Sequence, residues 1–234
     1  MTHAIRRLVL WALALALGCA AGAAAAEITV GGTAVFGAYE QDGVTENGPE
    51  AIEWLILDVR DGGALLISRY ALDVQPFHTR INEITWEKCA IRAWLNGEFL
   101  SAAFDEAQQA LIRVTEIDNG IAQSDAWCAN GGPATQDRVF LLSFAESTRY
   151  FGDDRARMCI PTAYALAQGA RINEADVTEE GAACWWWLRS PGFYRYYAAS
   201  VLASGARTNL GGVDSTTGAV RPVIWVEAGA LGEE

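Results

Sequence analysis

Several residue types are scarce in this 234-residue chain, and each scarcity narrows its function. The sequence holds one lysine, Lys88, and 17 basic residues against 29 acidic ones, which gives a formal net charge of −12 at pH 7. Such a chain has no basic stripe to neutralise a phosphate backbone, so we expect no nucleic-acid binding. Only His78 follows the first 26 residues. A lone loop histidine is more often structural than catalytic, so no Ser-His-Asp triad is expected.

The usual signatures of metal and cofactor sites are also missing. The sequence contains no CxxC pair, no phosphate loop of the GxxxxGKS type, and neither the Glu-Pro-Asn nor the Gln-Pro-Asp motif of calcium-dependent lectins. We therefore predict that the protein has no cofactor and no metal, and that it is not an enzyme.

Long hydrophobic runs are absent after residue 26. Residues 1–26 follow the layout of a secretory signal peptide: Arg6-Arg7, an apolar run over 8–17, and Ala24-Ala25-Ala26 before Glu27. We predict that this segment is removed, and that the mature chain, 27–234, has no transmembrane segment and is secreted or held in the cell envelope. In a second interpretation Cys19 is the lipidated residue of a bacterial lipoprotein.

The mature chain keeps four cysteines, Cys89, Cys128, Cys159 and Cys184. In an exported protein they allow three disulfide pairings, and spacing alone does not choose among them. In an organism that lives without oxygen, all four would stay as buried thiols. The sequence gives no indication of the oligomeric state.

The composition that is present, with 51% hydrophobic and 20% charged residues, is typical of one globular domain. Strand-like runs cover 33–39, 52–59 and 64–70. Asp61-Gly62-Gly63 between the last two runs predicts a hairpin, because tight turns need positive φ. A final strand over 220–226 is expected to pair with the N-terminal one.

Helical signals lie between residues 87 and 169. Ile91, Trp94, Leu95 and Phe99 recur at helical spacing. Two capping boxes, Asp105 with Gln108 and Ser143 with Glu146, predict helices over 106–112 and 144–151. Pro161 is expected to begin a short helix that Gly169 ends. Together these signals predict a single α+β domain with antiparallel sheets and flanking helices.

Several motifs resemble a family of exported bacterial proteins of unknown function. They are the run Cys-Trp-Trp-Trp-Leu-Arg-Ser-Pro-Gly at 184–192, Val-Arg-Pro at 220–222 before Trp225, and the segments 85–89, 92–96 and 135–137. That family is similar to the C-type-lectin fold of the formylglycine-generating enzymes and of the variable proteins of diversity-generating retroelements. The resemblance implies one C-type-lectin-like domain over 27–234 with a variable, ligand-binding tract at 192–217. The paired cysteines that formylglycine formation needs near the C-terminus are absent here.

The tract has the composition of a binding surface. Its rings and arginines offer rigid amphipathic area, and its small polar residues offer adaptable hydrogen bonds. Four aromatics among five consecutive residues cannot all face inward from a strand, although the alternative is that the rings fill the core of a twisted sheet. Replacement of adenines in codons ending in C or T yields no Lys, Glu, Gln, Met or Trp, and 193–217 contains none. The predicted ligand-binding residues are Phe193, Tyr194, Arg195, Tyr196, Tyr197, Ser200, Leu202, Ser204, Arg207, Thr208, Asn209, Leu210, Asp214, Ser215 and Thr216.

Residues around the tract are interpreted as scaffold. Trp185 and Trp187 share one face of a strand and Trp186 the other, so two of the three should pack in the core and one nearer the surface. An alternative role for Trp186 is stacking on a sugar. The remaining scaffold residues are two arginines expected to bridge loops to carboxylates or carbonyls, three glycines expected in turns, and a tryptophan of the final strand: Arg189, Arg221, Gly192, Gly205, Gly211 and Trp225.

The sequence therefore predicts a secreted, non-enzymatic protein that binds a protein or glycan ligand through 192–217. The resemblance further implies that a retroelement diversifies this tract. The alternatives from other classes are a carbohydrate-active or modifying enzyme of the cell envelope, with carboxylates that the sequence does not single out, and a fixed structural module of the envelope.

Overall fold

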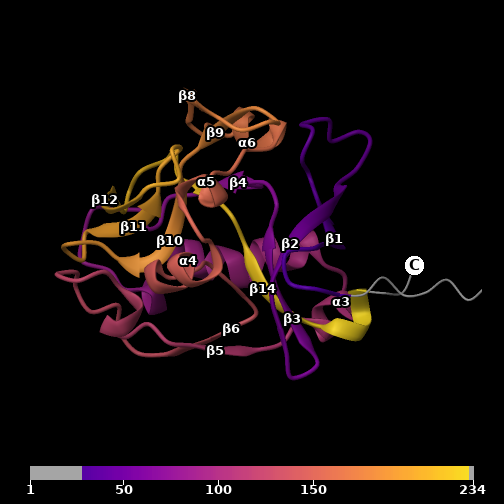
Figure 1. Cartoon of the computed structure of the whole chain (residues 1–234), viewed down its shortest axis with the longest axis horizontal. Coiled ribbons are helices and arrows are strands. Elements are labelled where there is room, and N and C mark those ends of the chain that lie inside the picture. Colours follow the sequence, from indigo (N-terminus) through magenta and orange to yellow (C-terminus); the bar gives the residue numbers. More distant parts are fainter. Residues whose placement is uncertain (1–27, 232–234) are drawn as a thin grey trace, which may run out of the picture.

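The computed structural model describes residues 28–231, and it is an α+β fold built on two five-stranded sheets (Figure 1). The predicted signal peptide and the alternative lipidation site at Cys19 lie outside the described residues. The first sheet has the order β1-β2-β3-β14-β7 and is antiparallel throughout. Its strands are β1 (Thr33–Tyr39), β2 (Glu50–Arg60), β3 (Gly63–Ser68), β14 (Val223–Glu227) and β7 (Val139–Phe140).

The second sheet carries the tract. Its order is β12-β11-β10-β13-β4, antiparallel except for the parallel pair β10 and β13. Its strands are β12 (Arg207–Gly212), β11 (Tyr197–Val201), β10 (Trp186–Pro191), β13 (Ala219–Val220) and β4 (Asp73–Val74). Two small sheets complete the fold, β5 (Thr115–Ile117) with β6 (Thr135–Asp137), and β8 (Ile172–Val177) with β9 (Ala182–Cys184).

The helices are short and cover the sheets. They are η1 (Trp86–Lys88), α1 (Ala90–Trp94), the π turn η2 (Leu95–Phe99), α2 (Leu100–Ala103), α3 (Glu106–Leu111), η3 (Ile121–Gln123), α4 (Phe144–Tyr150), α5 (Asp154–Arg157), α6 (Ala163–Ala167) and η4 (Ala228–Leu231). Within the described range, no helix has the length and apolar character needed to cross a membrane.

The structure contains the turn and the helix caps that the sequence predicts. The β2–β3 hairpin turns at Asp61 and Gly62, whose φ angles are 52° and 73°. Both predicted capping boxes form, at Asp105 before α3 and at Ser143 before α4. The short helix predicted from Pro161 begins slightly later, because Thr162 is the residue that caps α6.

The chain passes between the two sheets near its C-terminus. β14 lies in the N-terminal sheet, but it pairs with β3 and β7, so the expectation that it pairs with the first strand is wrong. β13 belongs to the second sheet and β14 to the first, so the crossing falls at Arg221 and Pro222. The buried Arg221 side chain donates from Nε to the Ser68 carbonyl at 2.8 Å, and its guanidinium lies 5.2 Å from the Trp186 ring centroid. Arg221 thus makes the carbonyl contact expected of a scaffold arginine.

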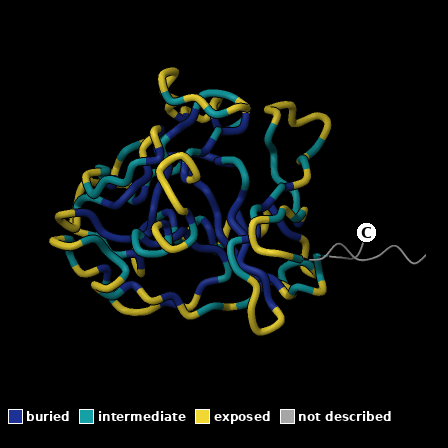
Figure 2. Tube along the Cα trace, in the orientation of Figure 1, coloured by how far each residue is buried: buried dark blue, intermediate teal, exposed yellow. Residues whose placement is uncertain are grey.

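The core lies between the sheets, where the trace is buried almost continuously (Figure 2). Trp186 and Trp187 are both 0% exposed, whereas Trp185 is half-buried and its ring lies 4.7 Å from that of Trp187. Two core tryptophans and one nearer the surface match the predicted number, but the pairing of Trp185 with Trp187 on the buried face is wrong, because Trp186 and Trp187 are the buried pair. Trp186 donates from its indole to the Arg157 carbonyl at 3.1 Å, so the interpretation of Trp186 as a sugar-stacking residue is wrong.

Candidate ligand-binding surface

The tract occupies the outer edge of the second sheet. It runs from the end of β10 through a turn into β11, through a second turn at 202–206 into β12, and through a third turn back to β13. β12 is the edge strand of this sheet, at the left rim of Figure 1. An edge strand leaves a row of backbone groups unpaired by its own sheet, so it offers main-chain donors and acceptors along with its side chains.

The turn between β10 and β11, which we name the aromatic turn (residues 193–197), presents a chain of packed rings. Phe193 is 46% and Tyr194 51% exposed. The Phe193 and Tyr194 rings meet edge to face at 4.8 Å, and Tyr194 stacks on Tyr196 at 5.2 Å. Tyr196 continues to Tyr197 at 4.7 Å. The prediction that some of these rings are exposed is confirmed, and the alternative that all of them fill the core is wrong.

Backbone contacts fix the aromatic turn. The Tyr197 amide donates to the Tyr194 carbonyl at 2.9 Å, and the Phe193 amide donates to the Asn209 carbonyl of β12 at 3.0 Å. A side chain at Gly192 would collide with the Asn209 carbonyl, and one at Gly211 would lie 2.7 Å from the Trp187 ring. Both glycines therefore permit close packing. Gly192 stands at the start of the turn between β10 and β11, whereas Gly211 lies inside β12, so the expectation that Gly211 is a turn glycine is wrong. Gly205 is a turn glycine, with φ +81°.

A second segment lies against the aromatic turn, and the sequence analysis missed it. We name it the Trp127 loop (residues 124–129). Asn209 donates from Nδ2 to Asp125 Oδ2 at 2.9 Å, and the Ala129 amide donates to the Gly192 carbonyl at 3.1 Å. Between these anchors Trp127 is 88% exposed and has φ 74°, a left-handed conformation that bulky residues rarely adopt. The only sequence signal is a tryptophan in a polar segment.

The other flank of the aromatic turn is the segment before α1. The Ile84 amide donates to the Arg195 carbonyl at 3.1 Å, and a cavity of about 200 Å³ is lined by Glu83, Ile84, Thr85, Lys88 and Arg195. Partial desolvation raises the pKa of the Tyr196 phenol, with Tyr197, Tyr194 and Glu83 adding to the shift. Tyr196 is therefore neutral at physiological pH and can both donate and accept a hydrogen bond.

The rest of the tract has two exposed turns, one after β12 and one at 202–206, and a buried part in β11. Ser200 is 1% exposed, because both faces of β11 are covered over residues 198–201, so its assignment as a ligand-binding residue is wrong. Asp214 and Thr216 are exposed and Ser215 half-buried in the turn after β12, which the Val213 amide joins to the Tyr196 carbonyl at 3.2 Å. Leu210 is 65% exposed on β12, whereas Thr208 and Asn209 are half-buried.

The second exposed end is the 202–206 turn, at the opposite end of the β11–β12 hairpin from the aromatic turn. Leu202 and Ser204 are exposed there, and a side chain at Gly205 would collide with the Asp154 backbone of α5. The Arg207 guanidinium lies 4.4 Å from the Phe144 ring centroid and contacts Thr148. Arg207 therefore holds the hairpin to α4.

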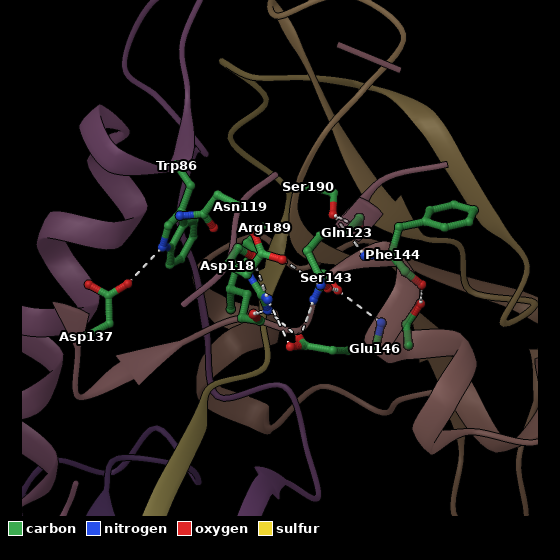
Figure 3. A network of polar contacts seen from close by, with 12 residues as sticks. Trp86, Asp118, Asn119, Gln123, Asp137, Ser143, Phe144, Glu146, Arg189 and Ser190 are labelled. Carbon is green, nitrogen blue, oxygen red and sulfur yellow. Dashed lines mark hydrogen bonds and ion pairs between the residues drawn. The ribbon is translucent and has the colours of Figure 1, made fainter. Parts of the chain in front are cut away.

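A polar network under the tract joins β10, α4 and the segment before the Trp127 loop (Figure 3). Arg189 donates to both carboxylate oxygens of Glu146, and to the Leu141 carbonyl at 2.8 Å and the Asp118 carbonyl at 3.2 Å. Although burial alone would raise the pKa of Glu146, the Arg189 guanidinium lowers it. These carboxylate and carbonyl contacts are those expected of a scaffold arginine.

The same network positions the Trp127 loop directly. Ser190 donates from its hydroxyl to the Gln123 carbonyl at 2.6 Å and accepts from the Phe144 amide at 3.0 Å. Ser143 donates to Gln123 Oε1 at 2.9 Å. Because Gln123 immediately precedes the loop, β10 and the cap of α4 together set where Trp127 stands.

Several hydrogen bonds converge on the buried carboxylate of Asp137. Its carboxylate accepts from Trp86 Nε1 at 2.9 Å, from Arg92 Nε at 2.6 Å and from the Thr135 hydroxyl at 2.8 Å. Trp86, Arg92 and Asp137 all belong to the segments that carry the family resemblance. In the structure these residues hold helices and loops in place below the surface.

Two further groups with side chains suited to chemistry are His78 and a cluster of carboxylates. His78 Nδ1 has no hydrogen-bond partner among the described residues. The carboxylates of Glu40, Asp42 and Glu50 come within 4.8 Å of one another, but they accept from loop amides such as those of Gln41, Gly43 and Val44. That pattern shapes the β1–β2 turn.

Comparison with known proteins identifies the family of the chain. Residues 61–228 match the family described as Domain of unknown function (DUF6273), and the chain belongs to this family. The match runs from the β2–β3 turn past the end of β14, so it includes the whole second sheet with the tract, the Trp127 loop, and the first sheet without β1 and β2. No curated protein and no solved structure matches the chain.

Proposed function

We propose that the chain is a non-enzymatic binding protein that recognises a protein or glycan ligand through the aromatic turn and the Trp127 loop. The observation that carries the proposal is the joining of these two segments. They are some 65 residues apart in the sequence, and the Trp127 loop is hydrogen-bonded to Gly192 and Asn209, the residues that flank and anchor the aromatic turn. Trp127, Phe193 and Tyr194 are exposed on the two segments. We also propose that the chain acts outside the cytoplasm, which the sequence of residues 1–26 supports.

The energetics favour recognition by these rings. Aromatic side chains bury large areas with little rotamer entropy, and tyrosine adds a polar handle. Stacking among Phe193, Tyr194 and Tyr196 restricts the rings before any ligand arrives, which lowers the entropic cost of binding. Such preorganised, exposed aromatics are what binding hot spots use.

Polar atoms at the seam between the two segments are also available. Asn209 Oδ1 and Ser124 Oγ are buried and have no hydrogen-bond partner among the described residues. Buried polar atoms usually have a partner, so a ligand group or a water would satisfy them. Arg195 adds an exposed charged donor beside the rings.

We further propose that the domain is C-type-lectin-like and that its tract is a diversified display surface. The support is the partition of the tract. Within the tract, Ala198, Ala199, Val201 and Val213 are 0% exposed, whereas most of the predicted ligand-binding residues are exposed or half-buried. Changes at those exposed and half-buried positions leave the core intact, which is what a variable binding face requires.

Binding is tested with the purified chain on a glycan array and on a library of displayed proteins. The matched variants are the triple variant Tyr194→Ala, Tyr196→Ala, Tyr197→Ala, and Val177→Ala on β8, which removes exposed apolar surface away from the tract. We expect ligand capture that the triple variant loses by at least ~100-fold, about 3 kcal/mol, and that Val177→Ala keeps. A triple variant that unfolds, or one that binds as well as the parent chain, contradicts the proposal.

Diversification is tested separately, by sequencing the encoding locus and its flanking DNA across a growing population. Changes confined to adenine positions in the codons of 193–216, with a near-copy template nearby, would establish it. A uniform tract without a template would contradict diversification. The proposal of a binding protein would stand, because the binding experiment tests it independently.

A further inference from the structure

Two of the four cysteines among the described residues face each other inside the protein. Cys159 and Cys184 form an isolated antiparallel bridge, in which the Cys184 amide donates to the Cys159 carbonyl at 2.8 Å. Side chains of directly opposed residues in an antiparallel pair project to the same face with their Cβ atoms about 4.5–5.5 Å apart. Both residues are buried, 2% and 0% exposed, and the Cys159 thiol also lies 3.6 Å from the Arg69 and Ile160 carbonyls.

The other two cysteines have different surroundings. The Cys89 thiol donates to the Trp86 carbonyl at 3.2 Å, and Cys128 lies in the Trp127 loop near Asp125. Neither contacts another cysteine among the described residues. Of the three pairings that four cysteines allow, the backbone supports only one bond without rearrangement.

We infer that Cys159 and Cys184 are a redox pair that closes to a disulfide when the folded chain meets a disulfide-type oxidant, while Cys89 and Cys128 remain thiols. The surroundings also set the order of the steps. A cavity of about 340 Å³ is lined by Cys159, Arg69, Tyr70 and Arg221, and it gives an oxidant a route to Cys159. Cys184 does not line this cavity.

The charge distribution makes Cys159 the attacking thiol. Burial alone would raise the pKa of Cys159, but the neighbouring Cys184 thiol and the Arg221 guanidinium lower it, whereas the neighbouring Cys159 and burial raise the pKa of Cys184. Arg221 Nη1 is buried without a hydrogen-bond partner among the described residues, so an anionic sulfur would be its natural neighbour. The thiolate is the species that attacks a disulfide.

The reaction then balances in two exchanges. The Cys159 thiolate attacks one sulfur of the oxidant's disulfide, and the oxidant's other sulfur leaves as a thiolate and takes up the proton. Cys184, deprotonated, then attacks the Cys159 sulfur and releases the second oxidant thiol. Two cysteine thiols are oxidised to one disulfide, and one oxidant disulfide is reduced to two thiols.

Closing this bond would stabilise the base of the tract. The cross-link encloses residues 160–183, and Cys184 stands next to the three tryptophans that lead into β10. A loop of this size restricts the unfolded chain, and the resulting stabilisation corresponds to a rise in Tm of about 6–12 °C for a domain of this length.

The test treats the reduced, folded chain with oxidised glutathione and maps the peptides without reduction. Trypsin places Cys159 on peptide 158–171 and Cys184 on peptide 172–189, while Cys89 and Cys128 fall on 89–92 and 114–138. We expect the first two peptides to be joined and the others to carry free thiols. A different linkage, or four free thiols with the chain folded, overturns the inference.

Single substitutions test the order of attack. Cys184→Ser should trap glutathione on Cys159, Cys159→Ser should leave Cys184 unmodified, and Cys89→Ser should form the disulfide and show the same redox shift in Tm as the parent chain. Glutathione trapped on Cys184 in the Cys159→Ser chain would overturn the assigned order. If a variant fails to fold, the peptide map of the unsubstituted chain still decides the pairing.

Discussion

Arg189 and Glu146 form a bidentate ion pair that joins β10, the strand leading into the tract, to the first turn of α4. Arg189 Nη2 lies 2.9 Å from Glu146 Oε1, and Nη1 contacts Oε2. The same carboxylate accepts from the Ser143 amide at 2.8 Å and so completes the capping box of α4. The Glu146 side chain therefore caps the beginning of α4 and also fixes β10, the strand that leads into the binding surface.

Replacing Glu146 with Gln should destabilise the protein in a pH-dependent way. At pH 7 the change leaves the buried Arg189 charge unpaired, which typically costs about 3 kcal/mol. Because the pKa of Glu146 is lowered in the folded state, its contribution is full well above the ordinary value of 4.5 and is lost as pH falls through the folded value. Urea unfolding at pH 7, 5 and 3 measures the difference between parent and variant.

The difference should shrink as the pH falls below 4.5. The exposed Glu174 on β8 supplies the control, because Glu174→Gln removes a carboxylate that makes no ion pair with a described residue and should change the free energy of unfolding by less than about 0.5 kcal/mol. An equal loss for Glu146→Gln at all three pH values would show that the ion pair does not act through charge.

The approach of the 202–206 turn to α5 is tested by two glycines with the same backbone angle. Gly205 and Gly43 both have φ +81°, but a side chain at Gly205 would collide with the Asp154 backbone, whereas one at Gly43 would meet nothing within 4 Å. Gly43→Ala should cost about 1 kcal/mol for the left-handed backbone alone. Gly205→Ala should cost about 3 kcal/mol, because the clash adds to the same strain.

Denaturant unfolding of the two variants gives the comparison directly. Equal costs would mean that the 202–206 turn does not lie against α5 as described. The Arg157 side chain supports that contact independently, since its Nε donates to the Gly205 carbonyl at 2.9 Å.

Features that depend on a few neighbouring residues could be predicted from the sequence. The capping boxes at Asp105 and Ser143 each need only four residues, and the Asp61-Gly62 turn needs two, so local chemistry decides them. Strand alternation did not predict which tryptophans at 185–187 are buried: it groups Trp185 with Trp187, whereas the structure buries the adjacent Trp186 and Trp187 because both faces of β10 are covered and Trp185 lies before the strand.

Features that depend on which strands become neighbours could not be predicted. The partner of β14 is set by the crossing at Arg221 and Pro222, which brings it beside β3, far from the edge strand β1. Gly211 reads as a turn residue in the sequence, and only the Trp187 ring packed over it shows that it is needed for close packing. The Trp127 loop was missed for the same reason, because its role arises from contacts with residues more than 60 positions away.

Trp127 combines a strained backbone with an exposed side chain. Two substitutions distinguish the effect of the backbone strain on stability from the effect of the ring on binding. Trp127→Ala and Trp127→Gly remove the same exposed ring, but only glycine adopts φ 74° without a steric penalty. Trp127→Gly should therefore be more stable than Trp127→Ala, by about 1 kcal/mol.

Both variants should lose affinity for the ligand by a similar factor, about 10-fold or more for an aromatic contact of this kind. Thermal unfolding and binding, measured on the same preparations, check both statements. Strain that persists at an exposed ring is best explained by what the ring does, so two variants that bind as tightly as the parent chain would remove Trp127 from the binding surface and leave the aromatic turn to act alone.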